Sequence, residues 1–118
     1  MSFNIFDIAG SGMTAQRVKM DTVASNIANI NTTRQADGSK GVYVKKDVSF
    51  RTIYEAEDGV KTVYDPSHPD ADEEGYVDLP NINLVEEMVG MISASKAYEA
   101  NATVAENVKT MMQSAMNI

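Results

Sequence analysis

The residues best suited to chemistry lie in one acidic stretch past the middle of the chain. Asp70, Asp72 and Glu74 occupy alternate positions and Gly75 follows them, as in the opening of a calcium-binding loop. Such a loop needs a bidentate glutamate at its twelfth position, and that position here is Asn81. Two prolines just upstream also exclude the helix that should enter the loop. We therefore expect a solvated acidic turn without a metal, and keep a calcium-binding module at residues 70–75 as the least favoured alternative.

His68 is the one histidine of the chain and lies between Pro66 and Pro69. A histidine that acts as a base or binds a metal needs an orienting partner or a nucleophile, and the neighbouring sequence offers neither. The chain also has no cysteine, which removes thiol catalysis and thiolate metal sites. We therefore predict that the protein is not an enzyme and has no catalytic residue, no metal and no cofactor.

The net charge of −7 is concentrated in the middle of the chain. Residues 32–80 carry eleven acidic and six basic side chains, whereas residues 1–31 are neutral and residues 81–118 nearly so. An acidic balance argues against nucleic acid and anionic membranes as partners. No apolar run approaches the ~20 residues that span a bilayer, and polar residues interrupt the stretch where a secretory signal would be apolar. We expect no direct membrane insertion.

Two apolar stripes of helical spacing lie at opposite ends of the chain. Their members recur every three or four residues, as in helices that pack against other helices. The first stripe predicts a helix from an N-cap at Asn4 to about Asn31, and the second predicts a helix that follows an N-cap at Asn83. We predict that the stripes form an assembly interface, which consists of Phe6, Met13, Met20, Val23, Ile27, Ile30, Leu84, Met88, Met91, Tyr98, Ala102, Ala105, Met112 and Met116.

Short β-prone runs separate the stripes. They cover residues 42–44, 48–50, 60–64 and 76–79, with Asp58-Gly59 as a hairpin signal. The predicted fold is mainly α with a small β element: two long terminal helices pack as a coiled-coil-like pair, with a short irregular β segment between them. We divide the chain into an N-terminal helix (1–31), an acidic, turn-rich central segment (32–80) and a C-terminal helix (81–118).

The stripes leave two functions open. If they close on each other within one chain, the protein is a stand-alone helical adaptor or a chaperone-like protein. If they face other chains, it is an assembly subunit. Six methionines lie on the stripes, and flexible thioethers suit contacts with non-identical partners.

Several of these segments resemble a known family. Residues 11–16 and 24–32 are similar to the N-terminal signature of the bacterial flagellar rod and hook axial proteins, and residues 64–77, 80–88 and 91–101 resemble the proximal-rod members. The resemblance covers nearly the whole chain, although residues 50–64 form a shorter stretch than this family leads us to expect. The matching motif residues are Ser25, Asn26, Asn29, Asn31, Thr32, Asp65, Pro66, His68, Pro69, Asp70, Asp72, Gly75, Tyr76, Pro80, Asn81, Asn83, Glu87, Tyr98 and Asn101.

The resemblance implies a structural subunit of the proximal rod in the flagellar basal body. Such a subunit polymerises in the periplasm through its terminal helices into a helical drive shaft, which transmits torque and encloses the export channel. The implied partners are copies of itself, other rod proteins (FlgB, FlgF, FlgG and a FliE-like protein) and the flagellar type III export apparatus. The resemblance also implies export without a cleaved signal peptide.

Overall fold

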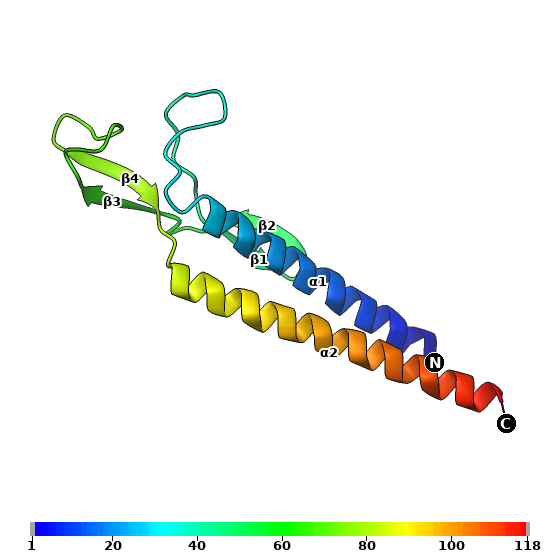
Figure 1. The fold of residues 1–118 in the computed structure, drawn as a ribbon. Helices are drawn as coiled ribbons and strands as arrows, with labels where there is room; N and C mark the ends of the chain where they lie inside the picture. The colour runs from blue at the N-terminus through cyan, green and yellow to red at the C-terminus, as the bar shows by residue number, and fades with distance from the viewer. Residues whose placement is uncertain (1, 118) are drawn as a thin grey trace.

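The computed structural model describes residues 2–117, with side chains from residue 5 onward, as an elongated molecule (Figure 1) of 77 × 24 × 22 Å. Over these residues the chain forms two helices and four strands. Their order is α1 (Ser2–Ala28), β1 (Lys46–Ser49), β2 (Thr52–Glu55), β3 (Val60–Tyr64), β4 (Tyr76–Pro80) and α2 (Leu84–Met116). This confirms the predicted fold class of two long helices with a small β element between them.

The ends of the helices are set by local hydrogen bonds. α1 begins at Ser2, so the prediction of an N-cap at Asn4 is wrong, and that residue lies inside the helix. At the other end, the side-chain amide of Asn29 donates to the carbonyl of Ser25 at 2.8 Å and satisfies one of the carbonyls that a helix end leaves free. The N-cap of α2 is confirmed, because the side chain of Asn83 accepts from the backbone amides of Val85 and Glu86.

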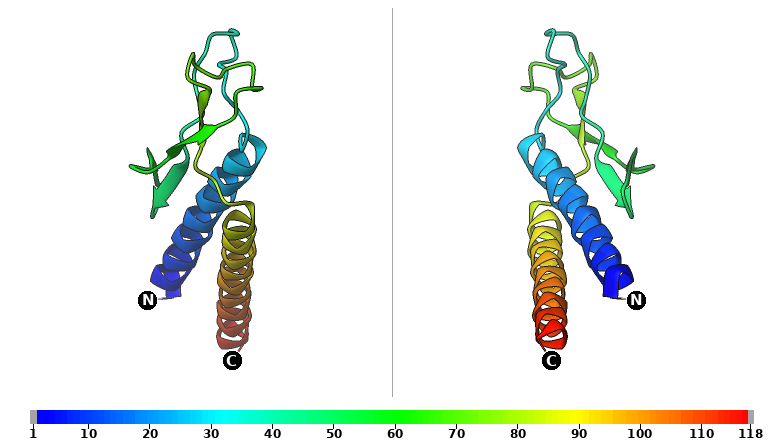
Figure 2. Two further views of the ribbon diagram at one scale, coloured as in Figure 1. Left: turned by 90° about the vertical axis from the view of Figure 1, so that its left-hand side faces the viewer. Right: turned by 90° about the vertical axis from the view of Figure 1, so that its right-hand side faces the viewer.

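α1 and α2 lie side by side and run in opposite directions (Figure 1). Gly12 lies against Asn101, and Val23 against Gly90. Moving forward along α1 by a given number of residues therefore corresponds to moving backward along α2 by the same number, as in an antiparallel helix pair. The axes are inclined to each other (Figure 2). Val23 lies in the contact opposite Gly90, and the other buried apolar residues of the two helices, Ala9, Ala15 and Ala94, are also small.

The central segment contains two separate antiparallel hairpins. β1 pairs with β2 and β3 pairs with β4. The predicted strand at 42–44 is absent from the structure described, and β2 was missed by the sequence patterns. Asp58-Gly59 joins β2 to β3, which belong to different sheets, so the hairpin signal there is also wrong. The tight turn is formed instead by Phe50 and Arg51, where Phe50 has a φ of 56°.

Candidate functional site: the neck and the outer stripe

Asn26 lies where three parts of the chain meet, and it is 1% exposed. Its amide nitrogen Nδ2 donates to the carbonyl of Lys46 at 2.9 Å and to Oε1 of Glu87 at 3.3 Å. Its oxygen Oδ1 accepts from the backbone amide of Lys46 and from the hydroxyl of Tyr43, both at 3.0 Å. One side chain at the end of α1 thereby binds both α2 and the start of β1.

Glu87 brings a negative charge into this buried cluster. It is 6% exposed and lies in the first turn of α2, where the helix dipole favours a carboxylate. Its Oε1 lies 3.9 Å from Nζ of Lys45, so the buried charge has a partner of opposite sign as well as the Asn26 amide. We call the cluster of Asn26, Tyr43, Lys45, Lys46 and Glu87 the neck.

The backbone of Gly59 extends the neck to the start of α2. The carbonyl of Gly59 accepts from the amides of Lys45 and Asn81, at 3.1 and 2.9 Å. The side chain of Asn81 also donates to the carbonyl of Asp58 at 2.8 Å. A Cβ at Gly59 would lie 2.6 Å from the side chain of Val44, so this approach requires glycine.

A second polar cluster ties the two loops of the central segment together. The carboxylate of Asp70, 5% exposed, accepts from the hydroxyl of Thr33 and pairs with the guanidinium of Arg34. The Thr33 hydrogen bond, assisted by the Arg34 charge, lowers the pKa of Asp70 below its usual 3.8 against the opposing effect of burial. His68 accepts from the Asp70 amide through Nδ1 at 3.0 Å. His68 therefore lies in a hydrogen-bonded turn and contacts Asp70, the residue that connects the two loops.

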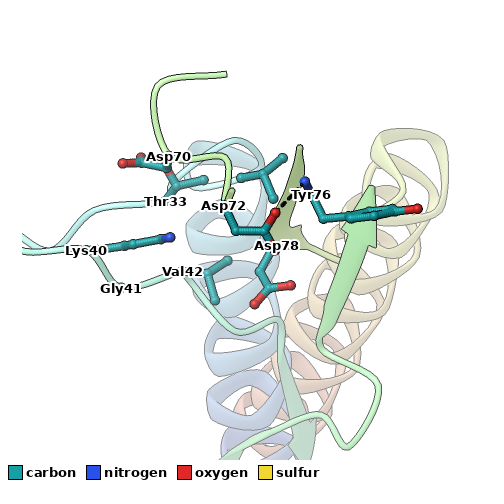
Figure 3. Close-up of a pocket in the computed structure, with 9 residues that line it drawn as sticks. Thr33, Lys40, Gly41, Val42, Asp70, Asp72, Tyr76 and Asp78 are labelled. Atoms are coloured by element: carbon teal, nitrogen blue, oxygen red, sulfur yellow. Dashed lines mark hydrogen bonds between the residues drawn. The ribbon is translucent and has the colours of Figure 1, made fainter. Parts of the chain in front are cut away.

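Thr33 and Asp70 also line a cavity of about 240 Å³ (Figure 3), into which Lys40 points. The other carboxylates at this cavity have partners within the chain. Asp72 accepts from the amides of Glu74 and Tyr76, and Asp78 accepts from the hydroxyl of Thr62. Across residues 2–117, no group of three or more histidine, cysteine or acidic side chains is placed to hold a metal ion. The calcium alternative thus gains no support.

The remaining motif residues take structural positions in turns and in the helix pair. Asp65 accepts from the hydroxyl of Ser67. Pro80 is fully buried, and Gly75 has a φ of +91° beside Tyr64 and Pro66. Motif residues from distant parts of the sequence are brought together at the neck (Asn26 with Glu87), whereas Asn101 lies far along α2 against Gly12.

The residues predicted as an assembly interface divide into two groups. Ten are buried or half-buried within the chain, namely Phe6, Met13, Met20, Val23, Ile27, Ile30, Met91, Tyr98, Ala105 and Met112. Four are exposed, namely Leu84, Met88, Ala102 and Met116. The fold therefore covers, at least in part, every predicted interface residue of the first stripe, but only half of those of the second.

An exposed apolar surface runs along the side of α2 that faces away from α1. We call it the outer stripe, and it consists of Leu84, Val85, Met88, Val89 and Ile92, which are 46–69% exposed. Sequence analysis included two of these residues and missed Val85, Val89 and Ile92, although their spacing of four and three was a usable signal. It also missed Tyr43, Lys45 and Lys46 of the neck, because only the fold brings them to Asn26.

In the part of the chain that the structure describes, neither helix is long and apolar enough to cross a membrane. Two family descriptions match this chain. "Flagella basal body rod protein" matches residues 6–34, and "Flagellar basal body rod FlgEFG protein C-terminal" matches residues 73–118. The matched segments hold most of α1 and all of α2, and both descriptions define a class of structural proteins of the flagellar rod.

Curated relatives narrow this class. The chain is 40% identical to flagellar basal-body rod protein FlgC of Borreliella burgdorferi, over 98% of this chain and 96% of that protein. It is 37% identical to FlgC of Bacillus subtilis, over 99% and 97%, and 47% identical to FlgC of Aquifex aeolicus, over 84% and 83%. The chain therefore belongs to the FlgC family of flagellar basal-body rod proteins, and it is a structural subunit of that rod.

Proposed function

We propose that this subunit belongs to the proximal rod and polymerises through its terminal helices into a helical shaft that transmits torque and encloses the export channel. In this proposal residues 1–31 and 81–118 form the rod core, and the acidic central segment, 32–80, faces outward. The outer stripe and those predicted interface residues that are not buried within the chain supply the contacts between subunits, whereas Val23 packs inside the helix pair.

The observation that carries this proposal is the outer stripe. Five large apolar side chains lie together on one face of α2 although the opposite face already packs on α1. Full burial of one such side chain contributes about 1.5–3 kcal/mol, so a neighbour that covers the stripe gains substantial free energy. The chain offers other exposed apolar groups, Ile5 and Ile8, on α1. A contact between two different surfaces of identical subunits is heterologous, and it produces open helical polymers when it does not close into a ring.

The family also bears on partners and on the route to the rod. We propose that the neighbours are copies of this chain and other rod proteins of the FlgB, FlgF, FlgG and FliE types, and that neither nucleic acid nor direct membrane insertion is involved. We further propose that the chain travels unfolded through the flagellar type III export apparatus, without a cleaved signal peptide, and folds in the periplasm.

The test is an image of isolated basal bodies from cells that lack this protein and from cells that carry it again. We expect rods to be lost and then restored together with swimming. A Met88→Asp variant should be exported but absent from basal bodies, because a buried, unpaired carboxylate costs several kcal/mol. Met88→Leu is the matched control and should assemble. Complete rods without the protein would refute a structural role, and assembly of Met88→Asp would remove the outer stripe from the contact.

A further inference from the structure

We propose that Asn26 is the positioning residue that fixes the direction in which the central segment leaves the helix pair. The central segment has two covalent connections to the helices, at residues 29–31 and 81–83. Two covalent connections alone do not fix the tilt of an attached body, so contacts between the central segment and the helices must fix it. Three of the side-chain contacts that do so are hydrogen bonds of the Asn26 amide to Tyr43 and Lys46. The Ser25–Tyr43 hydrogen bond and the Lys45–Glu87 ion pair add to them.

The four bonds of Asn26 use the whole hydrogen-bonding capacity of a side-chain amide, which has two N–H donors and two acceptor lone pairs. Three of them go to the segment that leads into β1, through both backbone groups of Lys46 and the hydroxyl of Tyr43. The fourth goes to Glu87 of α2. The amide therefore holds β1 at a fixed place relative to α1 and α2 together.

Other residues of this size cannot replace the amide. Aspartate would lose both donors and would place its oxygen against the carbonyl of Lys46 and the carboxylate of Glu87. Alanine would leave the buried polar groups around it without partners, which is unfavourable in a site closed to water. A Glu87→Gln change in the aspartate variant returns one donor, because the glutamine amide can donate to the new carboxylate at position 26. The double variant should therefore recover part of the lost order.

The experiment measures the distance between two spin labels in the full-length purified chain. The natural sequence has no cysteine, so Glu73→Cys and Ser93→Cys, both at exposed positions, place one label on the central segment and one on α2. We expect a narrow distribution of label-to-label distances, with a single peak, in the otherwise natural chain. Asn26→Ala and Asn26→Asp should broaden this distribution. Addition of Glu87→Gln to Asn26→Asp should narrow the distribution again in part. Asn107→Ala, which removes an exposed amide of α2, is the control and should leave the distribution unchanged.

A gentler variant guards against simple unfolding. Tyr43→Phe removes one bond to Asn26 and the bond between Tyr43 and Ser25 but leaves the Asn26–Glu87 bond between the helices. It should broaden the distance while the helix content, measured by circular dichroism, stays constant. An unchanged narrow distance in both Tyr43→Phe and Asn26→Ala would overturn the proposal, as would a broad distance in the natural chain.

The consequence for the rod rests on the proposed function, and the two are separable. Met88→Asp should lose incorporation into basal bodies yet keep the narrow label distance, because Met88 lies outside the neck. Tyr43→Phe should broaden the distance distribution of the free subunit, and its incorporation into basal bodies should fall as a result. Incorporation of Met88→Asp into basal bodies would contradict the proposed contact at the outer stripe and leave the role of Asn26 unaffected. A narrow distance distribution in the Asn26 and Tyr43 variants would contradict the role of Asn26 and leave the proposed contact unaffected.

Discussion

Gly12 of α1 lies so close to Asn101 of α2 that a methyl group at Gly12 would sit 2.8 Å from the amide nitrogen of Asn101. Gly10, two residues earlier, has nothing within 4 Å of the corresponding point. Two glycines that look equivalent in the sequence therefore differ: the first lies in open space, and the second permits close packing of the helices.

This contrast predicts unequal effects on the free energy of unfolding. Gly10→Ala should raise it by up to about 1 kcal/mol, because alanine is the better helix former. Gly12→Ala should gain less than Gly10→Ala, because the end of the Asn101 side chain must move to make room for the methyl group, and such overpacking has a cost. Urea unfolding followed by circular dichroism measures both. Equal stabilisation by the two variants would show that the helices do not approach at Gly12.

The half-buried Ile27 lies beside the neck on α1. Ile27→Asp should abolish rod assembly and swimming, because it loses the burial of an aliphatic side chain, at most about 1.5–3 kcal/mol, and adds a carboxylate without a partner. Export should survive better, since an unfolded chain has no packed interface to lose. Glu57→Lys, on an exposed residue of the central segment, is the control and should be tolerated. The readouts are swimming and the recovery of each variant in basal bodies. Normal swimming of Ile27→Asp would show that the first stripe is not an assembly surface.

The lowered pKa of Asp70 gives the stability of the central segment a definite pH dependence. A carboxyl group whose pKa is lower in the folded state stabilises that state fully above its unfolded pKa of 3.8, and this contribution disappears as the pH falls through the lowered value. Stability should thus change little on this account from neutral pH to about 4 and decline below it. Asp70→Asn should be less stable at neutral pH and lose part of the acid dependence. Parallel pH profiles for the two chains, measured by urea unfolding, would contradict the assignment.

Calcium should have no specific effect on this protein. Asp70 pairs with Arg34, and Asp72 accepts two backbone amides, so the carboxylates that imitate a calcium loop already hold the turn. Calorimetric titration of the natural chain should show no saturable calcium binding, and replacing Asp70, Asp72 and Glu74 by their amides should leave that result unchanged. Micromolar binding that disappears in the triple variant would restore the calcium alternative.

The helices could be predicted from the sequence because their signals are local. The period of three and four residues predicted both, and Asn83 marked the start of α2. The β pairing could not be predicted with the same success, since strands of four and five residues carry little pattern and Asp58-Gly59 looks like a hairpin turn while joining separate sheets.

The candidate site was likewise predictable only in part from the sequence. Asn26 and Glu87 were recognised as motif residues, but they lie 61 residues apart in the sequence, and no local pattern reveals that a buried amide meets a buried carboxylate. Tyr43 and Lys46 carry no signal of their own. Their importance comes from the position at which the fold places them.

The turn between β1 and β2 is a place where this fold can accept a change in length. All residues from Ser49 to Glu55 are exposed, and β2 pairs with β1 alone in its sheet. The alignments with the Borreliella burgdorferi and Bacillus subtilis proteins extend over 146 residues, against the 118 of this chain, so these relatives contain residues without a counterpart here. Extra residues at the turn would extend into solvent at a small entropic cost. Homologues of different length can in this way share one helix pair and one neck.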